Sequence, residues 1–264
     1  MDYKRGILGW PLERTYSPII HLYLSSICNL NIEYQKIALS KLNKTYFKDI
    51  NKNFDGYNVT VPYKSLIYKL INEESSHQLD NDSHEINAVN TVCNFENKLI
   101  ATNTDIIGIN QTIKSFDLDF VNKNILILGS GGSSKTFQYM FSESNEIYVA
   151  SRQGGDNTIQ YSEVDYIANE VDVLINTTPI GMPPYEDQIL PISHKKFKNL
   201  KVFFSLGYGS NIFINNSFEK SVLCIDGLTM LVAQAVASFN IWTSKGVIFD
   251  DVFNKIKERL SNEY

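Results

Sequence analysis

The sequence NILILGSGGSSKTF, residues 124–137, carries the clearest structural signal in the chain. Its apolar run predicts a buried strand, and the glycines that follow predict a tight turn into a helix. Gly129 and Gly131 would let backbone N–H groups approach a pyrophosphate at the start of that helix, while Ser134 is small enough for close packing. The alternative is a tight turn that binds nothing, but the flanking strand and helix favour a dinucleotide site.

Three more apolar runs follow at the spacing of strand–helix units. They are EIYVASR (146–152), VDVLINTTPIGM (171–182) and KVFFSLGY (201–208), and with the first run they predict a buried parallel sheet. The run EIYVASR ends at Ser151 and Arg152, where NAD-binding folds place an acidic residue that binds the ribose. A guanidinium there favours the 2′-phosphate of NADP, the alternative being a solvated surface arginine.

The first half of the chain also alternates apolar runs with helix-like stretches. The runs RGILG, PIIHLYLSSICNL, IEYQKIAL, YNVTVP and YKSLIYKLIN lie between Arg5 and Asn72. Their alternation predicts strands connected by helices in another α/β layer. The polar stretch from Asn72 to Glu85 predicts a loop, and INAVNTV (86–92) and KLIATNTD (98–105) predict two short extended pieces.

Helical patterns then connect the two halves and form the tail. IIGINQTIKSF (106–116) leads away from the first half and is a candidate domain connection. The tail holds LTMLVAQAVASFNIWTS (228–244) and IFDDVFNKIKERLSN (248–262), with Gly246 as the break between two helices.

Composition excludes several classes of protein. The chain has 264 residues, 43% hydrophobic and 20% charged, which excludes extended disorder. Its 24 basic against 29 acidic residues give a net charge of −5, so a nucleic-acid partner is not expected. The cysteines Cys28, Cys93 and Cys224 are isolated, which indicates neither a disulfide framework nor a metal site. No apolar run has membrane-spanning length, so we expect a cytoplasmic protein without a membrane partner.

Uncharged polar residues recur inside apolar segments of the first half. TYSP (15–18) taken alone is a turn signal, but in an extended segment its two hydroxyls would be directed into one site. Asn58, Thr60 and Lys64 lie in YNVTVPYK. Asn90 lies in INAVNTV, and Asn103, Thr104 and Asp105 follow. Burying such groups is costly unless they have partners. Each taken singly is explained as a turn or cap residue.

The order of these motifs along the chain is more informative than each motif alone. TYSP, NVTVPYK, AVNTV, NTD, GSGG, NTTPIGM and MLVAQA resemble the shikimate dehydrogenase family over nearly the whole chain. The resemblance implies a two-domain α/β fold, with a substrate-binding catalytic domain at 1–105 and 227–264 and a Rossmann-like NADP-binding domain at 106–226. The C-terminal helices then return to the first domain.

The resemblance also implies an activity and its residues. The activity is the NADP-dependent reduction of 3-dehydroshikimate to shikimate in aromatic amino-acid biosynthesis, by a monomer or a homodimer. Lys64 and Asp105 are the implied catalytic pair. The implied substrate-binding residues are Thr15, Ser17, Thr60, Asn90, Tyr208 and Gln234. The implied cofactor-binding residues are Gly129, Ser130, Gly131, Gly132, Ser133, Ser151, Arg152, Thr177 and Gly227.

The chain departs from the family pattern at a few positions. Thr15 replaces a serine, Gln153 ends the segment Ser-Arg-Gln where the family has Asn-Arg-Thr, and Ser205 replaces an acidic residue upstream of Tyr208. The stretch GSNIF (209–213) is shorter than the family's proline-containing turn. Two alternatives remain open, namely a quinate/shikimate dehydrogenase that uses NAD and a ligand-binding regulator of the same fold without catalysis.

Overall fold

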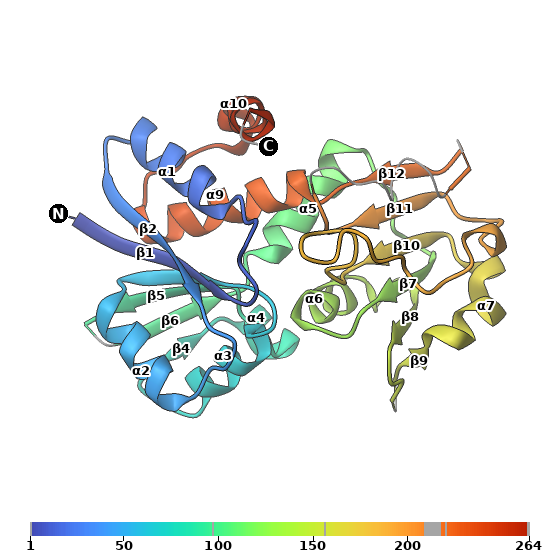
Figure 1. The fold of residues 1–264 in the computed structure, drawn as a ribbon, viewed down its shortest axis with the longest axis horizontal. Helices are drawn as coiled ribbons and strands as arrows, with labels where there is room; N and C mark the ends of the chain where they lie inside the picture. Colours follow the sequence, from blue (N-terminus) through green and yellow to red (C-terminus); the bar gives the residue numbers. More distant parts are fainter. Residues whose placement is uncertain (1, 97, 156, 209–217, 220, 263–264) are drawn as a thin grey trace. The chain divides into compact units, whose positions relative to one another are not determined.

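The computed structural model describes residues 2–96, 98–155, 157–208, 218–219 and 221–262 (Figure 1). Its internal contacts divide the chain into two compact units. Unit 1 comprises residues 1–112 and 229–264, and unit 2 comprises residues 113–228. The chain leaves unit 1 along helix α5 (Asp105–Ser115) and returns to it at the start of helix α9 (Leu228–Thr243).

Unit 1 is built on a six-stranded mixed sheet. Its strands are β1 (Asp2–Gly9), β2 (Asn31–Ala38), β3 (Gly56–Val59), β4 (Gln78–Leu79), β5 (Thr91–Phe95) and β6 (Lys98–Thr102). They lie in the order β2-β1-β3-β5-β6-β4. β1 pairs in parallel with β2 and β3, and β5 runs antiparallel to both β3 and β6. Of the two predicted extended pieces, KLIATNTD contains β6, whereas INAVNTV is only partly extended. Its residues Thr91 and Val92 begin β5, but Ile86 ends the preceding helix and Asn87 is left-handed.

Helices cover this sheet. Besides α5 and α9, they are α1 (Ser17–Ile27), α2 (Lys44–Asn53), α3 (Lys64–Asn72), α4 (Asn81–Ile86) and α10 (Phe249–Ser261). In α3 the buried residues include Lys64, Ile67, Tyr68 and Ile71, which recur at the spacing of one helix face. Gly246, at φ +65°, separates α9 from α10 as the sequence predicts.

The two faces of the sheet carry different cores, because side chains alternate along a strand. Leu8 of β1 packs in one cluster with Phe47 of α2 and Ile67 of α3. Its neighbour Ile7 points the other way and packs in a cluster with Trp242 of α9. Figure 1 shows α2 and α3 on one side of the sheet and α1 and α9 on the other.

The prediction of a loop from Asn72 to Glu85 is wrong, because this stretch contains β4 and most of α4. The Asp80 side chain caps α4 by accepting a hydrogen bond from the Ser83 N–H at 2.8 Å. Asn87 ends the helix in a left-handed conformation at φ +57°. Only Ser83 and Ile86 of α4 are buried, so the helix lacks the apolar periodicity from which it could have been predicted.

Unit 2 contains the parallel sheet that the apolar runs predict, which confirms the α/β fold class. Its strands are β7 (Asn124–Leu128), β8 (Glu146–Ser151), β9 (Ile159–Gln160), β10 (Val173–Asn176), β11 (Val202–Ser205) and β12 (Leu223–Ile225). Their order is β12-β11-β10-β7-β8-β9, and every adjacent pair is parallel. The α-helices described here are α6 (Gly132–Phe141) and α7 (Val164–Ile167).

Strands β7 and β10 occupy the middle of this sheet, and their apolar residues are almost completely buried. Short 3-10 helices cover Tyr161–Glu163, Ala168–Glu170 and His194–Lys196. Among the helices that the structure describes, none combines the length and the apolar character needed to cross a membrane.

Candidate active site

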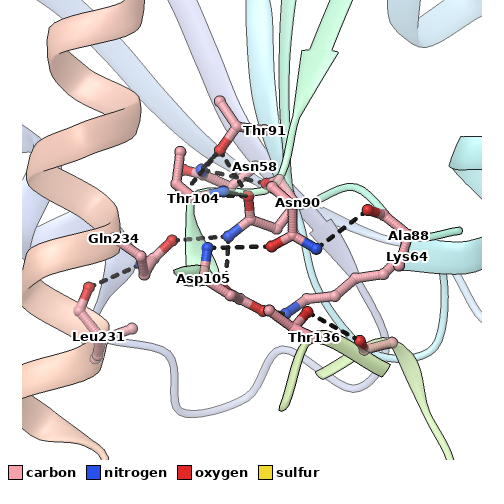
Figure 2. Close-up of polar contacts among 12 residues, drawn as sticks. Asn58, Lys64, Ala88, Asn90, Thr91, Thr104, Asp105, Thr136, Leu231 and Gln234 are labelled. Carbon is pink, nitrogen blue, oxygen red and sulfur yellow. Dashed lines mark hydrogen bonds and ion pairs between the residues drawn. The ribbon is translucent and has the colours of Figure 1, made fainter. Parts of the chain in front are cut away.

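A buried ion pair joins the starts of two helices in unit 1. Lys64 is the first residue of α3 and Asp105 is the first residue of α5, and the Lys64 ammonium donates a hydrogen bond to Asp105 Oδ2 (Figure 2). Their side chains are only 10% and 5% exposed. The N-terminus of α5 favours the carboxylate, whereas the N-terminus of α3 disfavours the ammonium. Asp105 therefore supplies the opposite charge that a buried ammonium group requires.

Asn90 holds the other oxygen of the same carboxylate. Its Nδ2 donates to Asp105 Oδ1 at 2.7 Å and lies 3.4 Å from Gln234 Oε1, a hydrogen-bond contact to α9. The Gln234 Nε2 donates in turn to the Leu231 carbonyl at 2.8 Å. The structure thus brings together Lys64, Asp105, Asn90 and Gln234, which come from widely separated motifs (Figure 2).

Asn103 links the two loops that present these groups. Its Nδ2 donates to the Ala88 carbonyl at 3.1 Å, and its Oδ1 accepts a hydrogen bond from the Asp105 N–H at 3.1 Å. The second bond satisfies one of the free N–H groups at the start of α5. In the sequence, Asn103 stands out only as a polar residue in an apolar segment, and this is the signal by which it can be found.

Thr15 and Ser17 also come together, but not in an extended segment. Ser17 begins α1, with Pro18 in its first turn, and Tyr16 already has helical backbone angles. The Thr15 hydroxyl donates to Ser17 Oγ at 3.3 Å and accepts a hydrogen bond from the Ser17 N–H at 3.3 Å. The backbone is not extended here because proline at the start of a helix favours this bend.

The other two predicted substrate-binding residues, Thr60 and Tyr208, lie in different units. Thr60 follows β3, and its methyl group would lie 2.4 Å from a Cβ at Gly9, so a glycine is needed where Thr60 meets β1. Tyr208 is half-buried and belongs to unit 2. The GSNIF stretch after it lies outside the described residues. Ser205, which replaces the family's acidic residue, accepts hydrogen bonds from Asn176 Nδ2 and the Gly207 N–H, both at 3.3 Å.

The glycine-rich turn between β7 and α6 has the form that the sequence predicts. Gly129 has φ +102°, and a Cβ there would meet Thr177 Oγ1 at 2.7 Å, so a side chain is excluded. A Cβ at Gly131 would meet no atom within 4 Å, and Ser130 and Gly131 are exposed. Ser134 is fully buried. With Gly132 and Ser133 opening α6, the turn leaves its N-terminal backbone groups accessible to an anion.

Of the other predicted cofactor-binding residues, Arg152 is exposed, whereas Ser151, Thr177 and Gly227 contact other parts of unit 2. Arg152 is exposed directly after β8, and the Ser151 hydroxyl accepts a hydrogen bond from the Gly154 N–H at 3.2 Å. Thr177 donates its hydroxyl proton to the Leu128 carbonyl at 2.8 Å, which ties β10 to β7. A Cβ at Gly227 would lie 2.1 Å from the Leu206 carbonyl oxygen, so this position requires glycine for close backbone approach.

The metal-ligating side chains in the described part of the chain do not form a metal site. There, no group of three or more His, Cys, Asp and Glu side chains could hold a metal ion. Cys28, Cys93 and Cys224 are free thiols, and burial raises the pKa of Cys93 and of Cys224.

Comparison with known proteins identifies the family. Residues 7–92 match the family model described as the shikimate dehydrogenase substrate binding domain. The shikimate dehydrogenase (NADP(+)) of Methanococcus maripaludis is 32% identical over 259 residues, which cover 91% of each chain. That of Clostridium botulinum is 30% identical over 93% of this chain and 98% of its own. A crystal structure of shikimate dehydrogenase 1 from Peptoclostridium difficile superposes with a TM-score of 0.86 at 31% identity, over 98% of this chain and 99% of that one. The chain belongs to the shikimate dehydrogenase family.

Proposed function

We propose that the protein catalyses the NADP-dependent reduction of 3-dehydroshikimate to shikimate, a step of aromatic amino-acid biosynthesis, in the cytoplasm. The observation that carries this proposal is the buried Lys64–Asp105 pair, held by Asn90 and flanked by Gln234. Its relatives bear the name shikimate dehydrogenase (NADP(+)). The substrate is a small molecule, and the active protein is a monomer or a homodimer.

Lys64 is the proton donor in this proposal. Reduction of a ring carbonyl leaves negative charge on its oxygen, and an ammonium beside that oxygen stabilises the charge and delivers a proton to it. In the reverse direction the neutral amine of Lys64 accepts the proton of the substrate hydroxyl. Asp105 orients Lys64 through the hydrogen bond to its ammonium and accepts a hydrogen bond from a second substrate hydroxyl.

The other polar groups of unit 1 fit a polyhydroxylated acid. Asn90 and Gln234 each offer an amide that both donates and accepts, which suits the ring hydroxyls. The paired hydroxyls of Thr15 and Ser17 are short donors that suit the carboxylate. Thr60 of unit 1 and Tyr208 of unit 2 complete the proposed substrate-binding set.

The residues of unit 2 fit NADP. The open N-terminus of α6 and the space beside Gly131 suit the pyrophosphate, and the exposed guanidinium of Arg152 suits the 2′-phosphate. When bound, the reduced cofactor supplies the hydride for the carbonyl carbon. We therefore assign substrate binding to residues 1–105 and 227–264, and cofactor binding to residues 106–226.

The proposal is tested by adding shikimate and NADP to the purified protein and following nicotinamide absorbance. We expect NADP to be reduced, faster with shikimate than with quinate and faster with NADP than with NAD. Faster reaction with quinate or NAD would assign the protein to the quinate/shikimate alternative. No reaction, with both ligands shown to bind, would favour the non-catalytic regulator.

A matched pair of variants then tests the assigned role of Lys64. Lys64→Ala removes the proton donor and should lower kcat by at least about 100-fold, with the affinity for NADP nearly unchanged. The control is Lys69→Ala, which removes an exposed lysine from the same helix and should leave kcat unchanged. Near-normal turnover of Lys64→Ala would remove Lys64 from the mechanism.

A further inference from the structure

The side-chain amide oxygen of Asn90 accepts three hydrogen bonds from neighbouring residues. Its Oδ1 accepts hydrogen bonds from the Thr104 N–H at 2.7 Å, the Thr104 hydroxyl at 3.1 Å and the Thr91 hydroxyl at 3.0 Å. A backbone N–H can only donate, so it holds the oxygen of the amide towards Thr104. The NH2 group of Asn90 is thereby directed at Asp105 (Figure 2).

The direction of the Thr91 hydroxyl follows from its other neighbour. Asn58 Nδ2 lies 3.3 Å from Thr91 Oγ1 and 3.4 Å from the backbone carbonyl of Asn90. That carbonyl can only accept, so the NH2 of Asn58 faces it and Thr91, while Asn58 Oδ1 accepts from the Tyr34 hydroxyl at 2.7 Å. Thr91 therefore accepts a hydrogen bond from Asn58, and its own hydroxyl group donates to Asn90 Oδ1.

These bonds form a chain in which each donor points towards the catalytic carboxylate. It runs from Tyr34 through Asn58, Thr91 and Asn90 to Asp105, whose other oxygen receives the Lys64 ammonium. Hydrogen bonds in such a chain polarise one another, most strongly where water is excluded. Asn58, Thr91 and Asn90 are 5%, 1% and 2% exposed, so the chain lies within the protein.

We propose that Thr91 is a positioning residue, whose hydroxyl orients and polarises the Asn90 amide and so fixes Asp105 and, through it, Lys64. Thr91 is too deeply buried to act on substrate directly. The inference rests on the proposed function, because it assumes that Asp105 and Lys64 carry the reaction. Thr104 shares the task through its hydroxyl, which lies 3.2 Å from that of Thr91.

The kinetic test compares Thr91→Val with Thr91→Ser. The valine removes the hydroxyl at nearly constant volume, and we expect kcat to fall about 3- to 10-fold, the effect of one buried hydrogen bond, with KM for NADP unchanged. The serine keeps the hydroxyl and should restore kcat to within about twofold of wild type. The matched control is Thr112→Val, because Thr112 is fully buried in the same unit and its hydroxyl donates to the Gly108 carbonyl of α5 at 2.9 Å.

A spectroscopic arm gives a readout that does not depend on turnover. The side-chain amide of Asn90 is identified in a proton–nitrogen NMR spectrum by its loss in Asn90→Asp. We expect its signals to move in Thr91→Val, to return in Thr91→Ser and to stay in place in Thr112→Val. Loss of thermal stability common to both valine variants would not produce this pattern.

The outcomes separate the two proposals. If the wild-type protein does not oxidise shikimate with NADP, the proposed function fails, and the NMR arm still decides whether Thr91 holds Asn90. If the Asn90 signals do not move in Thr91→Val, or if kcat falls as much in Thr91→Ser or in Thr112→Val as it does in Thr91→Val, Thr91 has no positioning role. Displaced Asn90 signals together with a loss of kcat confined to Thr91→Val support the role.

Discussion

Arg152 is the residue on which cofactor choice is expected to depend, because it stands exposed after β8 where NAD-binding folds carry an acid. Arg152→Ala should weaken NADP binding by roughly 1.5–3 kcal/mol, the value of a hydrogen bond to a charged group, and leave NAD binding almost unchanged. Titration calorimetry with both cofactors measures the difference. Lys198→Ala, an exposed cation of the same unit, is the control. Equal losses for both cofactors would show that Arg152 acts on the structure of unit 2.

His21 makes the stability of unit 1 depend on pH. Its ring is 1% exposed and stacks on Tyr34 at 4.5 Å between ring centroids. Burial lowers the pKa of His21 from 6.5 to about 3, so the unfolded chain binds a proton that the folded chain does not. The contribution of the neutral ring is complete above pH 6.5 and is lost as the pH falls towards 3. The loss amounts to as much as about 5 kcal/mol, at about 1.4 kcal/mol for each pH unit.

Urea unfolding of the wild type and of His21→Phe between pH 7 and pH 4 measures this contribution. The phenylalanine keeps an aromatic ring against Tyr34 and Trp242 but cannot take up a proton. The free energy of unfolding should therefore fall more steeply with decreasing pH in the wild type than in the variant. Parallel curves would mean that His21 is protonated without opening the core of unit 1.

At the scale of elements, the loops after β7 and β12 use glycine for opposite reasons. Gly227→Ala would place a Cβ 2.1 Å from the Leu206 carbonyl oxygen and should destabilise unit 2 by about 3 kcal/mol or more. Gly131→Ala meets no protein atom within 4 Å, so it should cost at most about 1 kcal/mol of stability. If the pyrophosphate lies against this turn, the same methyl group should abolish tight NADP binding. Thermal unfolding and cofactor titration distinguish the two effects, and a Gly131→Ala protein with normal NADP affinity would place the pyrophosphate elsewhere.

At the scale of the whole molecule, the two units should respond to different ligands. NADP at 100 times its dissociation constant stabilises the structure that binds it by about 2.7 kcal/mol. Hydrogen exchange followed by mass spectrometry should show slower exchange in residues 124–152 with NADP alone. Shikimate alone should instead slow exchange in residues 56–72 and 88–108. Protection of unit 1 by NADP alone, with none in unit 2, would overturn the assignment of the two binding roles.

Local patterns in the sequence account for most of the fold. Burial of consecutive apolar residues predicts β7, β8, β10 and β11, and turn chemistry predicts the glycine loop before α6, because both depend on neighbouring residues. Where those signals are weak the predictions fail. Helix α4 has a polar sequence and is held by its Asp80 cap. Helix α2, which is capped by Asn43, is likewise not predicted from the sequence.

The candidate site, like the fold, was predictable from the sequence only in part. The sequence motifs, through their resemblance to a known family, point to Lys64, Asp105, Asn90 and Gln234. No local pattern shows which of these residues contact one another. The folded chain brings α3, α5, α9 and the loop before β5 together, and it alone shows that Thr91 and Thr104 donate hydrogen bonds to the Asn90 amide oxygen. The physical reason is that a hydrogen bond requires its donor and acceptor atoms to lie within about 3.5 Å of each other at a suitable angle. Residues far apart along a chain reach that geometry only through tertiary packing.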